Sequence, residues 1–187
     1  MSFILKIYQD KRTVFRLSDI AMLFPGEKHH YLSDRLGYYV KTKRLVNLRK
    51  GIYVKPAFNP LELANRLYTP SYISLEFVLQ KAGIIFQYDS GITCVSYLSR
   101  KLEIDDYSLV YRRIKEEIIM DNTGIFQSPD NINMASPERA FLDLLYLNKD
   151  FYFDNTQSLD KQLIDSILPC FRSATLEKKV GNIFKNA

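Results

Sequence analysis

The feature that most constrains the fold is a pair of short apolar runs joined by a basic turn. Residues 45–48 and 52–54 carry the apolar runs, and Arg49-Lys50-Gly51 stands between them. Two such runs separated by a short turn that contains Gly predict a β-hairpin. Because helical patterns precede and follow this hairpin, the chain is expected to have an α+β fold.

Two helices and a strand are expected upstream of the hairpin. Apolar residues recur at helical spacing from Phe3 to Tyr8, and the β-branched and aromatic residues 14–16 suit a short strand. Ser18 has the position of an N-cap for a second helix, which Pro25-Gly26 stops. With the helix described next, the order of helix, strand, helix, turn, helix and basic hairpin is typical of a winged helix-turn-helix.

A third helix is expected to begin near His29 or His30. Its apolar stripe consists of Leu32, Leu36, Tyr39 and Val40. The second helix of a helix-turn-helix enters the major groove of DNA, so the opposite face is expected to lie over base edges. That face carries His30, Asp34, Tyr38 and Lys41, with Tyr31 and Arg35 at its margin, and Tyr31 is also expected over the base edges. Gly37 costs about 1 kcal/mol relative to Ala inside a helix, which predicts close packing or the close approach of another group.

Basic charge is concentrated in one block. The whole chain has a net charge of +5. Residues 28–56 contain eight Lys or Arg and one acid, so this segment carries +7 and the remainder −2. A concentrated basic block is typical of a surface that binds a phosphate backbone. The residues expected to hold phosphates are Lys28, Arg35, Lys43, Arg44, Arg49 and Lys50. The alternative is that these elements form a small packing module that binds protein.

The hairpin is followed by a boundary, which predicts a DNA-binding domain over residues 1–57 and a mixed α/β domain over 58–187. Asn59-Pro60 begins a helix with an N-cap and a first-turn Pro. Ser74 is expected to cap the next helix, and residues 92–98 and 107–114 read as strands with Asp105-Asp106 in the turn between them. Later helices are expected from Ser136-Pro137 onward and over about residues 159–168 and 176–184.

Several short sequence segments occur together in a specific order. They are residues 44–54, 70–85, 92–96, 111–115 and 135–147, the last reading Ala-Ser-Pro-Glu-Arg-Ala-Phe-Leu-Asp-Leu-Leu-Tyr-Leu. In this order and spacing the chain resembles the AbiEi-type antitoxins, the transcription-regulating halves of type IV toxin–antitoxin (abortive infection) pairs. The likeness runs from about residue 13 to residue 148, and the last 40 or so residues resemble no family.

The resemblance implies a partner and a mode of regulation. It implies that the N-terminal domain represses the promoter of its own operon, and that the C-terminal domain counteracts a nucleotidyltransferase-like toxin, in general without a stable complex. The chain departs from the expectation of a strongly basic recognition helix, because His29-His30-Tyr31 and Asp34 occupy that helix. The operator sequence therefore does not carry over.

Catalytic and cofactor chemistry has little support. Asp105-Asp106 and Glu116-Glu117 are interpreted as solvated acids, and His29-His30 has no third metal ligand nearby. No phosphate-binding Gly-rich motif is present, and no His follows residue 30 to serve a Ser or Cys nucleophile. We therefore expect no enzyme, no cofactor and no metal. Cys94 and Cys170 are interpreted as buried apolar residues. Without a secretory signal or a membrane-spanning run, a cytoplasmic protein is expected.

A second basic run leaves two interpretations open. Arg112, Arg113 and Lys115 would form a further nucleic-acid or toxin-facing surface, or else charges that blunt a solvated edge strand. Two other functions also stay open. The first is a ligand-responsive repressor without a toxin, which a pocket with convergent polar groups in the C-terminal domain would favour and a neighbouring nucleotidyltransferase gene would oppose. The second is a direct toxin-binding module, and the patterning of the chain argues against the disordered arm in which such a module would end.

Overall fold

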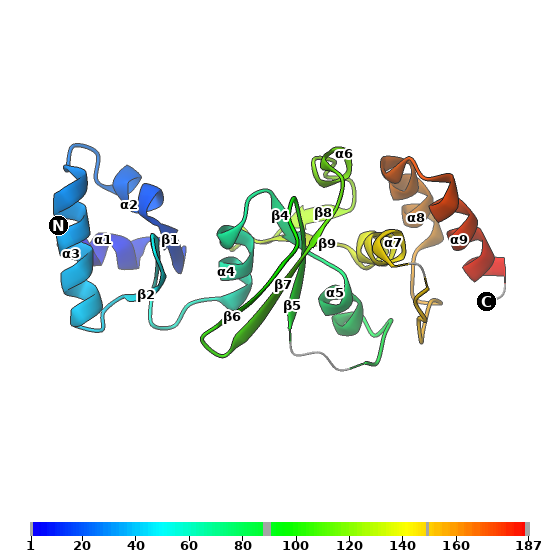
Figure 1. Ribbon diagram of the computed structural model, residues 1–187, viewed down its shortest axis with the longest axis horizontal. Coiled ribbons are helices and arrows are strands. Elements are labelled where there is room, and N and C mark those ends of the chain that lie inside the picture. Colours follow the sequence, from blue (N-terminus) through cyan, green and yellow to red (C-terminus); the bar gives the residue numbers. More distant parts are fainter. Residues whose placement is uncertain (1, 88–90, 149, 186–187) are drawn as a thin grey trace. The chain divides into compact units, whose positions relative to one another are not determined.

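The computed structural model describes residues 2–87, 91–148 and 150–185, and the chain divides into two units, Met1–Leu67 and Tyr68–Ala187. Helices and a β-sheet occur in both units, which confirms the α+β fold class (Figure 1). The expected boundary at residue 57 precedes α4 (Pro60–Leu67), whereas the division into units follows this helix.

The first unit combines short helices with a three-stranded antiparallel sheet of order β1-β3-β2. Phe15 pairs with Tyr53 across β1 and β3, and Val46 pairs with Val54 across β2 and β3. The order of helices and strands is the one expected from the sequence. The elements before α4 are α1 (Phe3–Gln9), β1 (Val14–Arg16), α2 (Leu17–Leu23), α3 (His29–Lys41), β2 (Val46–Arg49) and β3 (Ile52–Val54).

An aromatic stack holds α1 against the helices that follow it. The Phe3 ring lies 4.3 Å from the Phe24 ring and 5.6 Å from the Tyr39 ring, nearly parallel to both. Ile7, Ile20 and other apolar side chains from every helix before α4 share this core. Burial of these side chains is the main source of stability for helices as short as α1 and α2.

Polar contacts join α4 to β1 and α2. The Glu62 Oε2 atom accepts hydrogen bonds from the Thr13 backbone N–H at 2.8 Å and from the Thr13 hydroxyl at 2.6 Å. Arg66 forms an ion pair with Asp19 at 3.0 Å. Asp19 also accepts a hydrogen bond from the Arg16 backbone N–H, so α2 begins at Leu17 and the prediction of Ser18 as its N-cap was wrong. Because these contacts cross from α4 to the start of the unit, α4 packs with the first unit.

The second unit is built on a six-stranded mixed sheet of order β6-β7-β5-β4-β9-β8. The pairs β5–β7 and β4–β9 are parallel, and the other neighbouring strands are antiparallel. The strands are β4 (Ser71–Ile73), β5 (Ile92–Ser96), β6 (Arg100–Ile104), β7 (Tyr107–Arg113), β8 (Ile125–Gln127) and β9 (Asn133–Ala135). The helices are α5 (Glu76–Lys81), α6 (Glu116–Ile119), α7 (Pro137–Leu147), α8 (Lys161–Ile167), the 3-10 helix η1 (Leu168–Phe171) and α9 (Ala174–Lys185).

The buried helix α7 lies between the sheet and the terminal helices α8 and α9 (Figure 1). The expected start of this helix is confirmed, because Ser136 caps it by accepting a hydrogen bond from the Arg139 backbone N–H. The side chains of α7 from Glu138 to Leu145 are all buried. A helix buried on every side holds the layers of the second unit together.

Three expectations for the second unit were wrong. Ser74 does not cap α5, because its hydroxyl donates to the Asp143 carboxylate at 2.7 Å and the N-cap position belongs to Leu75. The turn at Asp105-Asp106 follows the unexpected strand β6, and not the strand at residues 92–98. Strand β7 lies inside the sheet between β6 and β5, so it is not an edge strand.

Candidate nucleic-acid interface

The helix α3 presents one face to the core and the opposite face to solvent. Leu32 and Leu36 are 1% and 0% exposed, whereas Tyr39 and Val40 are half-buried at the margin of the core. The spacing of these residues fixes the rotation of the helix in the unit. Every residue expected on the DNA-facing side is exposed. These residues are His30, Tyr31, Asp34, Arg35, Tyr38 and Lys41, and Lys28 is exposed just before the helix.

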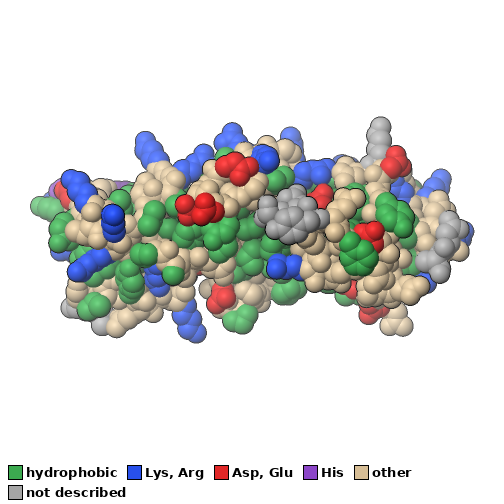
Figure 2. Space-filling view, turned by 90° about the horizontal axis from the view of Figure 1, so that it is seen from below, with side chains coloured by type: hydrophobic (Ala, Val, Ile, Leu, Met, Phe, Trp, Pro, Cys, Tyr) green, Lys and Arg blue, Asp and Glu red, His purple; other side chains and the backbone are tan. Residues whose placement is uncertain are grey.

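Aromatic side chains stand among the charges on this face. Tyr31 and Tyr38 are 56% and 61% exposed, and the Tyr31 ring lies 4.0 Å from the His30 ring. Figure 2 shows Lys and Arg side chains projecting from the first unit, at the left of the view, with hydrophobic side chains between them. Exposed tyrosines, which combine an apolar ring with a hydroxyl, are typical of a surface that contacts another molecule.

Gly37 is half-buried and lies at the edge of this exposed face, one helical turn from Asp34 and from Lys41. A Cβ atom built at Gly37 would meet no described atom within 4 Å. The described residues therefore do not pack closely against Gly37, and the expectation of close packing was wrong. A helix position without a Cβ leaves room for another group near the backbone.

The C-terminus of α3 ends in a Schellman motif that contains a lysine. The Lys43 N–H donates to the Val40 carbonyl at 3.0 Å, and the Arg44 N–H donates to the Tyr39 carbonyl at 2.9 Å. Lys43 adopts φ +56°, the left-handed region that such motifs usually fill with Gly. Lys43 and Arg44 are both exposed. The chain thus places a cation at a backbone position where an L residue is strained.

The β2–β3 hairpin places two further cations at its turn. Arg49 ends β2, Lys50 follows it, and both are exposed. Gly51 adopts φ +78°, which allows the tight turn. The pairing of β2 with β3 shifts register between Asn47 and Arg49, and such an irregularity bends a strand and re-aims its side chains.

Arg35 and Lys55 of the basic block form contacts within the unit. Arg35 forms an ion pair with Glu27 at 2.7 Å, and its guanidinium lies 5.4 Å from the centre of the Phe3 ring. The Lys55 ammonium donates to the Asp10 carbonyl at 2.6 Å, and burial lowers the pKa of Lys55. The other six cations of the block are exposed. These are Lys28, Lys41, Lys43, Arg44, Arg49 and Lys50.

The second basic run does not form one surface along a strand. Arg112 is half-buried and donates to the Asn148 side-chain oxygen at 2.9 Å. Strand β7 ends at Arg113, and Lys115 is the N-cap residue of α6, so Arg113 and Lys115 do not share the face of a strand. Both of these side chains are exposed. The interpretation of the run as charge that blunts an edge strand was wrong, because β7 is interior.

The environments of the cysteines and of the acidic side chains, in the part of the chain that the structure covers, bear on metal binding and on thiol chemistry. No cluster of three or more His, Cys, Asp or Glu side chains there could hold a metal ion. Cys94 is fully buried, which raises the pKa of its thiol far above the usual range and disfavours the thiolate nucleophile. Cys170 is only half-buried, in contrast to the expectation that both cysteines are buried.

Comparison with known proteins identifies no family for this chain. No protein-family model and no curated protein sequence matches the chain. Within the described ranges, none of the helices has the length and apolar character needed to cross a membrane.

Proposed function

We propose that the first unit is a winged helix-turn-helix that binds duplex DNA, with α3 in the major groove and the β2–β3 turn on a flanking phosphate backbone. The observation that carries this proposal is the coincidence of three properties on one face of α3. The face is exposed, it combines aromatic with charged side chains, and it has Gly37 at its edge. The exposed cations of the basic block lie at both ends of α3 and on the β2–β3 turn, where they would hold phosphates and set the register of α3 on the bases.

We further propose that the chain is a type IV antitoxin that represses its own operon and counteracts a nucleotidyltransferase-like toxin. Support for the toxin comes from the resemblance to the AbiEi family. Outside the first unit, the sequence segments that show the resemblance form β4, α5, β5, the end of β7 and α7. These segments build the sheet and the buried helix of the second unit, so the resemblance covers the core of that unit.

A gel shift with the full chain tests the repressor half of this proposal. The chain is titrated against its own upstream promoter and against scrambled DNA of equal length, at two salt concentrations. Retention of the promoter that survives the higher salt supports sequence-specific repression. Equal and salt-sensitive retention of both DNAs would reduce the basic block to a general phosphate contact and contradict the repressor.

Removal of the hairpin cations tests the placement of the turn. Arg49→Ala combined with Lys50→Ala should weaken binding to all sequences and flatten the salt dependence by about two phosphate equivalents. The matched control is Lys178→Ala with Lys185→Ala, which removes two exposed cations from α9. An unchanged salt slope in the hairpin variant contradicts the assignment of the turn to the phosphate backbone.

Co-expression tests the antitoxin half. The gene downstream of this chain, expressed alone, should arrest growth, and co-expression of the chain should restore it. The hairpin variant should still restore growth when both genes are driven from foreign promoters, because repression is then irrelevant. A downstream gene that encodes no nucleotidyltransferase-like protein contradicts the proposal.

A further inference from the structure

A pocket lies at the carboxyl ends of the parallel strands β5 and β7. Ser96 at the end of β5 pairs with Arg113 at the end of β7, and Ser71 at the start of β4 pairs with Ser96. The pocket has a volume of about 460 Å³ and is lined by residues next to these strand ends and from α6, among them Pro70, Tyr97, Arg113, Glu116 and Met120. The carboxyl ends of parallel strands are a frequent place for ligand sites in α/β sheets.

The apolar part of the pocket suits a flat ring. Tyr97 is 47% exposed and Met120 is 64% exposed, although both side chains are large and apolar. The Tyr68 ring meets the Tyr97 ring edge-on, with the ring centres 6.5 Å apart, and Tyr68 also packs edge-on against the buried Tyr111. Tyr97 is therefore supported from the core side while part of its surface stays open. A supported aromatic ring at a pocket is a stacking platform for a nucleobase.

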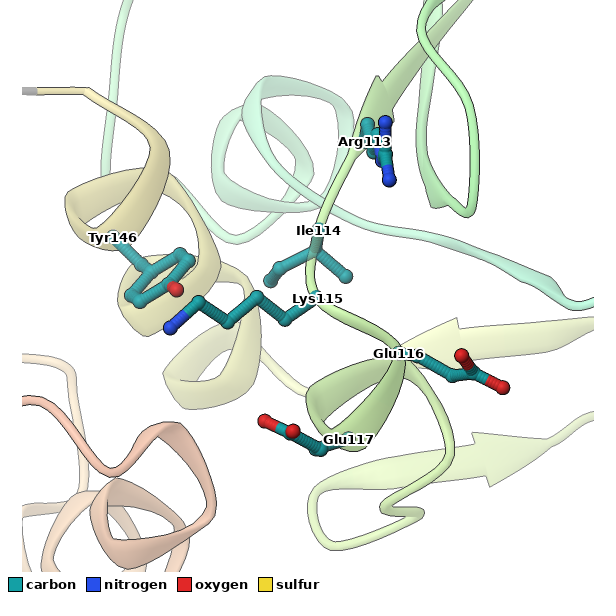
Figure 3. A pocket seen from close by; sticks show the side chains of 6 residues that line it. All are labelled: Arg113, Ile114, Lys115, Glu116, Glu117 and Tyr146. Atoms are coloured by element: carbon teal, nitrogen blue, oxygen red, sulfur yellow. The ribbon is translucent and has the colours of Figure 1, made fainter.

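The polar part of the pocket offers one cation and one anion. Figure 3 draws the neighbouring pocket, which shares Arg113, Ile114 and Glu116 with this one. It shows Arg113 and Glu116 on one side of the segment between β7 and α6, and Lys115 on the other side, extended toward Tyr146. Neither the Arg113 guanidinium nor the Glu116 carboxylate forms an ion pair within the described parts of the chain. The guanidinium is thus available to an anionic group of a ligand, and the carboxylate to hydrogen-bond donors.

We propose that this pocket binds a guanine nucleotide, with the base stacked on Tyr97 and its phosphate on Arg113. A carboxylate has only acceptor oxygens. Guanine presents two adjacent donors on its Watson–Crick edge, the N1–H and the exocyclic amino group, which match the two oxygens of Glu116. Adenine, cytosine and uracil each present a single type of donor group there. The nucleotide is either free or an unpaired nucleotide of a single-stranded RNA, since both offer the same base and phosphate.

This proposal does not rest on DNA binding by the first unit. All the lining residues belong to the second unit, and the exposed cations of the first unit play no part in it. The hairpin variant Arg49→Ala with Lys50→Ala should therefore bind the nucleotide as well as the natural chain does. Failure of one proposal leaves the other intact, and the two are tested with different ligands.

Calorimetry of the full chain tests the proposal with GMP, AMP, CMP and UMP, and with a five-nucleotide RNA that contains or lacks one guanosine. GMP is expected to bind at least tenfold more tightly than the other mononucleotides. Binding of GMP itself identifies a free nucleotide as the ligand. Binding only of the guanosine-containing RNA identifies single-stranded RNA. No saturable binding of GMP or of either RNA at concentrations up to about 1 mM overturns the proposal.

Variants assign the roles within the pocket. Tyr97→Ala should weaken GMP binding about tenfold or more, because it removes the stacking surface. Glu116→Gln should abolish the preference for GMP over AMP, and Arg113→Ala should weaken binding of GMP but not of guanosine. The control is Tyr152→Ala, which removes an exposed aromatic ring that does not line this pocket and should change nothing. Unchanged GMP binding in Tyr97→Ala, or a preserved preference in Glu116→Gln, overturns the proposal.

Discussion

Arg139 and Asp143 lie one helical turn apart on α7, and both side chains are completely buried, with Arg139 Nε 3.2 Å from Asp143 Oδ1. The guanidinium also donates to the backbone carbonyls of Ile118, Asp121 and Thr123. The carboxylate accepts further hydrogen bonds from the Tyr72 and Ser74 hydroxyls. The pair therefore joins α7 to β4 and to the segment after α6, and desolvation of both charges is offset by this set of hydrogen bonds.

Removal of either partner should destabilise the second unit strongly. We expect Asp143→Ala to lower the free energy of unfolding by about 3–5 kcal/mol, because the Arg139 charge stays buried without its counter-ion. Urea unfolding followed by circular dichroism measures this change, with the two units allowed separate transitions. The control Lys101→Ala removes one partner of an exposed ion pair and should leave the midpoint unchanged. A loss below about 1 kcal/mol would contradict the buried ion pair.

The Asp10 carboxylate should make the first unit sensitive to acid. A hydrogen bond from the Arg12 side chain lowers the pKa of Asp10 from its ordinary value of 3.8. A carboxyl whose pKa is lower in the folded state contributes stability that is present above the unfolded-state pKa. That contribution is lost as the pH falls through the lower, folded-state pKa.

Replacement of Asp10 by Asn tests whether its carboxylate stabilises the first unit at neutral pH and loses this effect in acid. Asp10→Asn should be less stable than the natural chain at pH 7 by no more than about 1 kcal/mol, because the ion pair with Arg12 is only partly buried. The difference should shrink toward zero as the pH falls below about 3. Urea unfolding at a series of pH values from 7 down to 2.5 measures it. A difference that stays constant over this range would show that the charge of Asp10 contributes nothing.

Local signals in the sequence predicted the first unit and α7, because their determinants lie close together along the chain. The apolar stripe of α3, the Gly-containing turn before β3 and the cap at Ser136 each act within one or two helical turns or one hairpin. Interactions distant in sequence decided the elements that were missed. The three-residue strand β4 pairs with both β5 and β9, and β9 also pairs with β8, so strands distant in sequence define these short elements.

In the candidate site, too, local sequence signals were predictive and contacts between different elements were not. Helical periodicity alone predicted which α3 residues are exposed. It did not predict that Glu27 engages Arg35, because the partners come from different elements. Ser74 has the pattern of an N-cap, but its hydroxyl donates to Asp143, 69 residues later in the chain. The pocket near Tyr97 and Arg113 also escaped detection from sequence, because only the parallel pairing of β5 with β7 brings these residues together.

Replacement of Lys43 by Gly should have opposite effects on stability and on DNA binding. Lys43→Gly should raise the free energy of unfolding by up to about 1 kcal/mol, because Gly adopts the positive φ of this position without strain. The same change should weaken DNA binding and reduce the salt slope by about one phosphate equivalent. Lys43→Arg, which keeps both the charge and the strain, should alter neither property. A variant with Gly that binds DNA as tightly as the natural chain would remove Lys43 from the interface.

Gly37 offers the sharpest test of how closely DNA approaches α3. Gly37→Ala should stabilise the first unit by about 1 kcal/mol, because Ala favours the helix and the added methyl group meets no described atom. If the groove lies over this face, that methyl group takes up space between the helix and the DNA, and affinity for the promoter should fall. Gly181→Ala is the matched control. It adds a methyl group to α9 that likewise meets no described atom, so it should stabilise the second unit and leave DNA binding unchanged. Chemical unfolding and gel shifts measure both variants. Unaltered promoter affinity in Gly37→Ala would mean that the backbone at Gly37 does not contact DNA closely.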